Sequence, residues 1–173
     1  MTPKLTVSAA TVAACLSIPA TIWSADPAHG QQPFEPTCAP FAIERHLDRI
    51  AFIDQGEEGV SVGDRQVLRF DLLSHDGALI GSQQVMATVV HGHMAGAYEM
   101  MIDGTVILDD GMVRVSTVGP LRDPADTSAA SADTLQWAVD DGTGTFAGAF
   151  RTMTTSPRGD GAYDVDFEIS CPG

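Results

Sequence analysis

Two histidines and a glutamate stand close together in the segment "HGHMAGAYEMMIDG", residues 91–104. His91, His93 and Glu99 imitate the pattern with which a cupin strand binds a metal ion, because alternate residues of a strand project from the same face. The glycines and alanines between His93 and Glu99 favour a loop, however, and no histidine follows His93 to complete the ligand set. We therefore predict exposed loop histidines and no metal site.

Other common catalytic patterns are missing from the sequence. No serine stands in a nucleophile-elbow sequence, and the glycine-rich segment "DDGTGTFAGAF" lacks the Lys-Ser/Thr pair of a phosphate-binding loop. Lys4 is the only lysine, so a chain that has lost its N-terminal segment could not form a lysine Schiff base or attach pyridoxal phosphate. The sequence therefore predicts a protein without a metal or other cofactor.

The charge of the chain excludes two classes of partner. The 173 residues carry a formal net charge of −14 and no basic cluster. A surface this acidic repels the phosphate backbone of nucleic acids and anionic membranes. We expect neither as a partner.

The N-terminus has the features of an export signal. Lys4 precedes an apolar stretch over residues 5–18, which Pro19 and several small residues follow. An uncleaved membrane anchor is the alternative, although the stretch is short and weakly apolar for a span. We predict an export signal over residues 1–28, a flexible lead-in over 29–40 and a single domain over 41–173. The predicted product is secreted and has no membrane contact after cleavage.

The cysteines indicate a disulfide. Cys15 would be lost with the export signal, which leaves Cys38 and Cys171. An even number of cysteines in an exported chain predicts a bridge between them, and two free thiols are the alternative.

Hydrophobic alternation predicts the fold class. In "AYDVDFEIS", residues 162–170, every second side chain is apolar and the residues between are mostly acidic, which is typical of a strand with one buried face. Five Asp-Gly pairs punctuate the chain, and such pairs favour hairpin turns. No segment beyond the leader shows a helical repeat. We predict strands over 41–53, 65–74, 78–90, 97–108, 112–118, 133–139, 145–153 and 162–170.

Eight short strands are typical of an antiparallel barrel or a sandwich. The cysteine pair favours the barrel, because Cys38 precedes the first strand and Cys171 follows the last, so pairing of these strands brings the thiols together. The prediction is an all-β, eight-stranded antiparallel closed barrel, lipocalin-like in shape. The segment 120–133 would be a lid, a binding loop or a plain surface excursion. The side chains expected inside the barrel are Leu68, Phe70, Leu72, Tyr163, Val165, Phe167 and Ile169.

Several segments resemble the allene oxide cyclase and dirigent barrels. "GVSVGDRQVLRFDLLSHDGALIGSQQVMATVV" is similar to the core hairpin of that family, "IDGTVILDDGMVRV" to its central hairpin, and "DGTGTFAGAFRTM" to its Gly-Thr-Gly-x-Phe-x-Gly-Ala segment. The resemblance covers most of residues 41–170 and extends to the bacterial spirotetronate-type cyclase barrels. It implies an apolar cavity that holds a flexible substrate in one reactive shape without a cofactor.

The resemblance leads to two functional hypotheses. The first is an exported, cofactor-independent cyclase or isomerase that binds an apolar, polyunsaturated small molecule and guides its cyclisation or coupling. The second is a secreted carrier or interaction module that binds such a molecule without changing it. The sequence leaves a homo-oligomer open.

Polar and aromatic residues that interrupt apolar faces are the predicted site. A carboxyl group in an apolar barrel could act as an acid or base, and an arginine could hold an enolate or a carboxylate. The alternative for both charged residues is an outward surface position. The predicted catalytic residues are Glu44 and Arg151, and the predicted substrate-binding residues are Phe70, Tyr98, Trp137, Phe150 and Phe167, with Glu99 as a further polar candidate.

Overall fold

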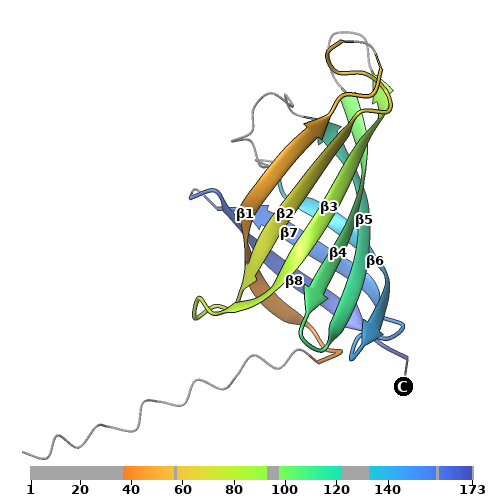
Figure 1. Cartoon of the computed structure of the whole chain (residues 1–173). Helices are drawn as coiled ribbons and strands as arrows, with labels where there is room; N and C mark the ends of the chain where they lie inside the picture. The colour runs from red at the N-terminus through yellow and green to blue at the C-terminus, as the bar shows by residue number, and fades with distance from the viewer. Residues whose placement is uncertain (1–36, 57, 93–97, 122–132, 159, 173) are drawn as a thin grey trace, which may run out of the picture. The chain divides into compact units, whose positions relative to one another are not determined.

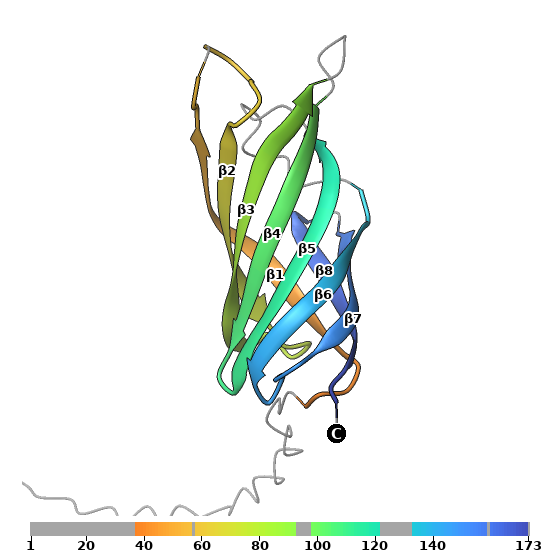
Figure 2. The ribbon, with the colours of Figure 1, turned by 90° about the vertical axis from the view of Figure 1, so that its right-hand side faces the viewer.

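The computed structural model describes residues 37–56, 58–92, 98–121, 133–158 and 160–172. Within these ranges the chain forms eight antiparallel strands that close into a barrel (Figures 1 and 2), as the sequence predicts. No helix in the described part is long and apolar enough to cross a membrane. The strands are β1 (Phe41–Ile53), β2 (Arg65–Leu73), β3 (Leu79–Gly92), β4 (Tyr98–Leu108), β5 (Gly111–Leu121), β6 (Leu135–Gly144), β7 (Phe150–Pro157) and β8 (Ala162–Ser170).

Each strand pairs with its neighbours in sequence, and β1 closes the barrel against β8. Phe41 lies opposite Phe167 at this seam, and Arg45 lies opposite Tyr163. Cys38 precedes β1 and Cys171 follows β8 at the same end of the barrel. They form the predicted disulfide, with 5.8 Å between their Cα atoms. The covalent bridge therefore closes the seam that joins the first and last strands.

Side-chain alternation places the core inside the barrel. On β8 the acidic side chains are exposed while the four apolar ones between them are buried, because successive side chains of a strand point to opposite faces. Phe70 and Leu72 on β2 are also buried, and Leu68 is half-buried. The inward positions predicted from the sequence are thus confirmed.

The seventh strand begins five residues later than predicted. The segment 145–149 is a tight turn, in which the amide of Phe146 donates to the carbonyl of Thr143 and the amide of Ala149 donates to that of Phe146. Gly144 precedes the turn and Gly148 lies within it, with φ values of 62° and 72°, which glycine adopts without steric cost. The apolar residues of this turn imitate a strand in the sequence, so the predicted strand over 145–153 is wrong in its first half.

The Asp-Gly pairs have two different roles. Three of them lie in hairpin turns as predicted, at 76–77, 110–111 and 160–161. The pairs at 103–104 and 141–142 lie inside β4 and β6 instead. A Cβ atom on Gly142 would come within 2.2 Å of the carbonyl oxygen of Phe146, so this glycine allows the turn after β6 to fold back on the strand.

The segment that contains the histidines is only partly described. His91 lies on β3 and pairs with Glu99 on β4, so the prediction that it is a loop residue is wrong, although its side chain is exposed as predicted. Strand pairing continues past this residue to Gly92 and Tyr98. His93 lies outside the described residues, as does most of the segment 120–133.

Candidate functional site

A buried arginine marks the interior of the barrel. In β1, Phe41, Ile43 and Leu47 alternate with more polar residues, and Arg45 occupies the inward position between Ile43 and Leu47. Only 4% of the surface of Arg45 is exposed. Arginine is rarely buried to this degree unless it is paired, so its surroundings decide its role.

Aromatic rings surround the guanidinium group. Its central carbon lies 4.4 Å from the ring centre of Phe70 and 4.4 Å from that of Tyr163. Trp137 is more distant, at 5.8 Å. Phe70 and Tyr163 meet edge to face, with their ring centres 6.2 Å apart. The electron-rich faces of such rings attract the cation and partly replace the water that burial removes.

Two hydrogen bonds fix the polar side chains of this cluster. The Nη1 atom of Arg45 donates to Oε1 of Gln83 over 3.0 Å. The indole Nε1 of Trp137 donates to Oγ1 of Thr155 over 3.1 Å. Gln83 and Thr155 are themselves buried. The orientations of Arg45 and Trp137 are therefore set by residues of other strands. We call Arg45, Phe70, Gln83, Trp137, Thr155 and Tyr163 the arginine cluster.

Burial changes the acidity of both ionisable groups in the cluster. It lowers the pKa of Arg45 to about 10, because the charged form loses its hydration, and Tyr163 offsets part of this effect. Burial raises the pKa of Tyr163, and the neighbouring charge of Arg45 opposes that shift. At neutral pH the cluster is a fixed positive charge beside a neutral phenol. It can orient and stabilise a negative charge but is not poised to remove a proton.

The predicted substrate-binding residues fall into separate groups. Phe70 and Trp137 are buried members of the arginine cluster. Phe167 is also buried, but it stacks on Phe41 with their ring centres 4.5 Å apart, below the cluster and toward the disulfide. Tyr98 is half-buried at the start of β4, and Phe150 is 50% exposed at the start of β7. The structure therefore brings together two of the five predicted substrate-binding residues, Phe70 and Trp137.

The two predicted catalytic residues do not join the cluster. Glu44 alternates with the inward residues of β1 and forms an ion pair with Arg158, in which Oε1 lies 2.7 Å from Nη1. Its pKa is lowered mainly by the hydrogen bond from Arg158. Arg151 is exposed on β7, and Glu99 is exposed on β4. Catalytic roles for Glu44 and Arg151 remain predictions. The structure instead places the charged side chain of Arg45 inside the barrel.

Sequence reasoning missed Arg45 and Gln83 as site residues. The signal for Arg45 was present, because the alternation of Phe41, Ile43 and Leu47 places residue 45 on the same face. Gln83 carries a weaker signal, because the apolar pairs Val85–Met86 and Val89–Val90 leave open which face of β3 is buried. A polar residue that strand alternation places on the inward face is therefore a better candidate for the site than one that only lies near apolar residues in the sequence.

Metal-binding side chains are not gathered in the described part of the chain. No group of three or more histidine, cysteine, aspartate or glutamate residues there could hold a metal ion. Because His93 lies outside the described residues, this finding does not address the full His-x-His pattern.

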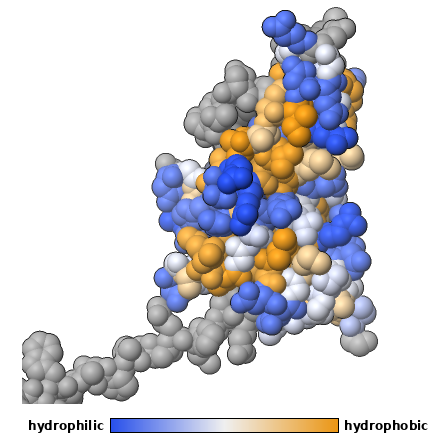
Figure 3. Space-filling view, viewed as in Figure 1, coloured by the Kyte–Doolittle hydropathy of each residue, from blue (hydrophilic) through white to orange (hydrophobic). Residues whose placement is uncertain are grey.

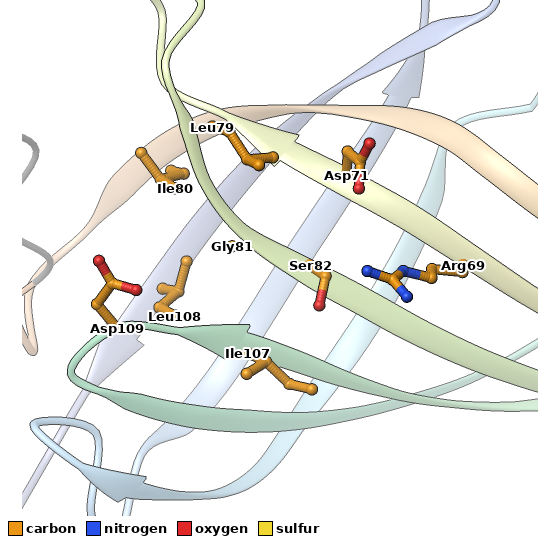
Figure 4. Close-up of a pocket in the computed structure, with 9 residues that line it drawn as sticks. All are labelled: Arg69, Asp71, Leu79, Ile80, Gly81, Ser82, Ile107, Leu108 and Asp109. Atoms are coloured by element: carbon orange, nitrogen blue, oxygen red, sulfur yellow. The ribbon is translucent and has the colours of Figure 1, made fainter.

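A separate pocket lies on the outside of the barrel. It has a volume of about 310 Å³ and is formed by β2, β3, β4 and the turn after β4 (Figure 4). Arg69 and Asp71 contribute charges of opposite sign, and Leu79 and Ile80 contribute apolar surface. None of the residues predicted for the site lines this pocket. The full set of lining residues is Arg69, Asp71, Leu79, Ile80, Gly81, Ser82, Ile107, Leu108 and Asp109.

The outer face of the barrel also carries exposed apolar side chains. Val67 and Met86 are cross-strand partners on β2 and β3, and Met101 and Val118 are partners on β4 and β5. All four are at least 40% exposed. Figure 3 shows hydrophobic surface among hydrophilic residues on the face where β1, β2 and β3 lie. A homo-oligomer remains a prediction.

Known structures share this barrel. Pyocyanin demethylase superposes with a TM-score of 0.63 at 19% identity, over 76% of this chain and 100% of that one. AbnU, an exo-specific intermolecular Diels–Alderase, matches with a TM-score of 0.55 at 13% identity, over 76% of this chain and 98% of that one. The Diels–Alderase AbmU from Streptomyces koyangensis matches with a TM-score of 0.52 at 12% identity, over 78% and 69% of the two chains.

At these identities the likeness shows the fold alone. No protein-family model matches the sequence, and no curated protein matches it. The barrel is nevertheless one that Diels–Alderases use, which agrees with the cyclase part of the predicted resemblance. The resemblance to allene oxide cyclase and dirigent proteins stays a prediction.

Proposed function

We propose that this protein binds an apolar, unsaturated small molecule inside its barrel and guides the cyclisation or coupling of that molecule. The observation that carries the proposal is the arginine cluster, in which a buried cation is surrounded by three aromatic rings within a closed barrel. The Diels–Alderase activity of AbnU and AbmU supports it, because those proteins use the same fold.

Each part of the cluster has a role in this proposal. The flat indole of Trp137 offers a surface on which a conjugated ligand can lie, while Phe70 packs against the guanidinium group of Arg45. The hydrogen bond from Trp137 to Thr155 holds the indole in one orientation, so the ligand meets a rigid wall. Arg45 supplies a charge that can polarise a conjugated carbonyl group or stabilise an enolate.

Positioning is the main source of rate acceleration in such a site. Holding two reacting ends of one molecule in contact can lower a barrier by about 7–11 kcal/mol in the best cases. In a cycloaddition, π bonds of the ligand become the new σ bonds, so no leaving group, oxidant, proton transfer to the protein or covalent intermediate is needed. A cyclisation of this kind is therefore independent of a cofactor, and shape and the fixed charge of Arg45 account for it.

The proposal includes export of the protein. The disulfide between Cys38 and Cys171 fits an oxidising environment, and the predicted leader over residues 1–28 would direct the chain there. We propose that the mature protein acts outside the cell. Intact-mass measurement of the protein from culture medium tests this, and a product that retains residues 1–28 would contradict it.

Native mass spectrometry of the protein from its own host tests the proposed function. We expect a bound small molecule, and incubation of the protein with a linear precursor of that molecule should yield the cyclised or coupled product faster than buffer does. Recovery of every added compound unchanged would instead establish a carrier.

Tryptophan fluorescence tests whether the ligand binds in the arginine cluster. Trp23 lies in the predicted leader, so Trp137 would be the single tryptophan of the mature chain. A ligand in the arginine cluster should quench its emission and should lose affinity in Trp137→Ala. Val118→Ala is the control, because this exposed side chain on β5 lies outside the cluster and outside the predicted site. Equal binding to both variants would remove Trp137 from the site.

A further inference from the structure

Two buried donor atoms in the arginine cluster have no hydrogen-bond acceptor among the described residues. Among the residues that the structure describes, no hydrogen-bond partner reaches Nε of Arg45 or Nε2 of Gln83. Arg45 is 4% exposed and Gln83 is fully buried. Buried polar groups in proteins are nearly always hydrogen-bonded, and an exception calls for an explanation in terms of function.

The chemistry of the pair fixes what these atoms can bind. Arginine has donors only, so the atom of Gln83 that meets Arg45 must be its carbonyl oxygen. The amide nitrogen of Gln83 is then a donor as well. Each of the two atoms is therefore an N–H donor without an acceptor among the described residues, and a group that satisfies either of them must be an acceptor.

The charge of Arg45 narrows the class of acceptor. No carboxylate in the described part of the chain forms an ion pair with this arginine, in contrast to Arg158, which lies within 4 Å of Glu44, Asp160 and Asp164. A buried charge without a counter-ion costs free energy, and aromatic rings offset only part of that cost. An anion would accept the hydrogen bond and also balance the charge of Arg45, whereas a neutral acceptor would only accept the hydrogen bond.

The rings around Arg45 define the direction of approach. Phe70 and Tyr163 lie 4.4 Å from the guanidinium carbon, so they occupy space next to the group. Its in-plane edge at Nε is the part that still needs a partner. A planar oxyanion matches this edge, because guanidinium and carboxylate groups form hydrogen bonds in a common plane.

A glycine on β4 keeps room for the amide of Gln83. A Cβ atom on Gly104 would come within 3.3 Å of Nε2 of Gln83 and within 3.0 Å of a methyl group of Val115. Any side chain at residue 104 would therefore crowd the donor.

We propose that Arg45 and Gln83 bind a planar oxyanion, a carboxylate or an enolate, carried by the unsaturated ligand of the barrel. The inference rests on the proposed function for the entry of a ligand into the barrel interior. The inference applies equally to a catalyst and to a carrier, since either must hold the anionic end of its ligand in a fixed position.

A matched pair of probes tests the charge of the ligand. We would titrate the mature protein with 2-naphthoate and with 2-naphthamide, which differ in charge but hardly in shape, and follow the emission of Trp137. We expect 2-naphthoate to bind at least about tenfold more tightly, as expected for a charge-assisted pair. This preference should vanish in Arg45→Met and persist in Arg114→Met, which alters an exposed arginine on β5.

Three results would overturn the inference. They are equal affinity for the two probes, a preference for naphthoate that survives in Arg45→Met, and no binding of either probe at millimolar concentration. Equal affinity would leave the proposed cyclisation intact. Selective binding of 2-naphthoate by a protein that converts no precursor would contradict the proposed function and support the anion site.

The stability of the ligand-free protein gives a second measurement. The double variant Arg45→Met and Gln83→Leu replaces an uncompensated buried charge and its partner with apolar groups of similar volume. We expect its melting temperature to equal or exceed that of the wild type, because such replacements are often stabilising. A fall of more than about 10 °C would show that Arg45 is structural and would overturn the inference.

Discussion

The interior of the barrel contains two regions that differ in what holds them together. At the disulfide end, the ring centres of Phe41 and Phe167 lie 4.5 Å apart and those of Phe41 and Phe146 lie 5.9 Å apart. In the arginine cluster, aromatic rings surround a charge instead of one another. Both regions arise from strands with the same inward alternation, and β1 contributes Phe41 to one and Arg45 to the other.

We propose that this difference separates stability from function. Apolar burial and a disulfide each stabilise the fold without the help of a ligand. A buried guanidinium whose Nε atom has no partner among the described residues lowers stability, and we interpret its presence as a sign of another purpose. We therefore assign the disulfide end to stability and the arginine cluster to binding, and the following predictions test that division.

Reduction of the disulfide should have the largest effect on stability. The bridge closes a loop with a sequence separation of 133 residues. In the loop-entropy model its loss lowers the free energy of unfolding by up to about 5 kcal/mol. Thermal denaturation with and without a reducing agent measures the change, and ligand affinity at low temperature should stay the same. Two titratable thiols in the denatured but unreduced secreted protein would contradict the bridge.

Truncation of one ring in each region tests the division directly. Phe167→Ala and Phe70→Ala should each lower the free energy of unfolding by about 3–5 kcal/mol, because both rings are buried. Only Phe70→Ala should also weaken ligand binding, since only Phe70 contacts Arg45. Denaturant titration and fluorescence titration give the two quantities. If both variants lost ligand equally, the two regions would not be separate.

Acid should loosen the connection between β1 and β2 before the disulfide end. The carboxylate of Asp64 accepts hydrogen bonds from the amides of Gln55, over 2.7 Å, and Ser61, over 2.6 Å. These bonds lower its pKa from the ordinary value of 3.8, with that from Gln55 first. The folded pKa is depressed, so the stabilisation is fully present above about pH 4 and is lost as the pH falls through the folded pKa.

Hydrogen exchange at several pH values measures this effect. The amides of Gln55 and Ser61 should lose protection below pH 4 in the wild type. Asp64→Asn should weaken their protection at pH 7 and remove its dependence on acid. Unchanged protection of both amides in Asp64→Asn at pH 7 would show that the carboxylate does not hold this connection.

Gly104→Ala should have the smallest effect on stability and a selective effect on binding. The added methyl group crowds Nε2 of Gln83 and the side chain of Val115. We expect a cost of about 1 kcal/mol, at the low end for overpacking, together with weaker binding of 2-naphthoate. Gly77→Ala is a control of the same type outside the barrel interior, although its φ of 82° adds strain. Tighter binding in Gly104→Ala would contradict the position assigned to the amide.

Much of the fold could be predicted because its signals are local. The alternation of β8 predicts which side chains are buried, and Cys38 and Cys171 predict the bridge that closes the barrel. The site was harder to predict. Glu44 and Arg45 are adjacent polar residues on one strand. The alternation of β1 indicates that residue 45 faces inward, but only the register with the other strands decides that Glu44 pairs with Arg158 and that Arg45 meets Gln83.

The sequence by itself determined the strand periodicity, the all-β class and the pair of cysteines, since each depends on neighbouring residues or on residue type. Only the tertiary structure decided the composition of the arginine cluster. Closure of the barrel brings Gln83, which is 38 positions from Arg45 in the chain, within hydrogen-bond distance of it, and places Trp137 and Tyr163 around the same charge. Contacts between residues so far apart depend on strand order and register, and no local pattern encodes them.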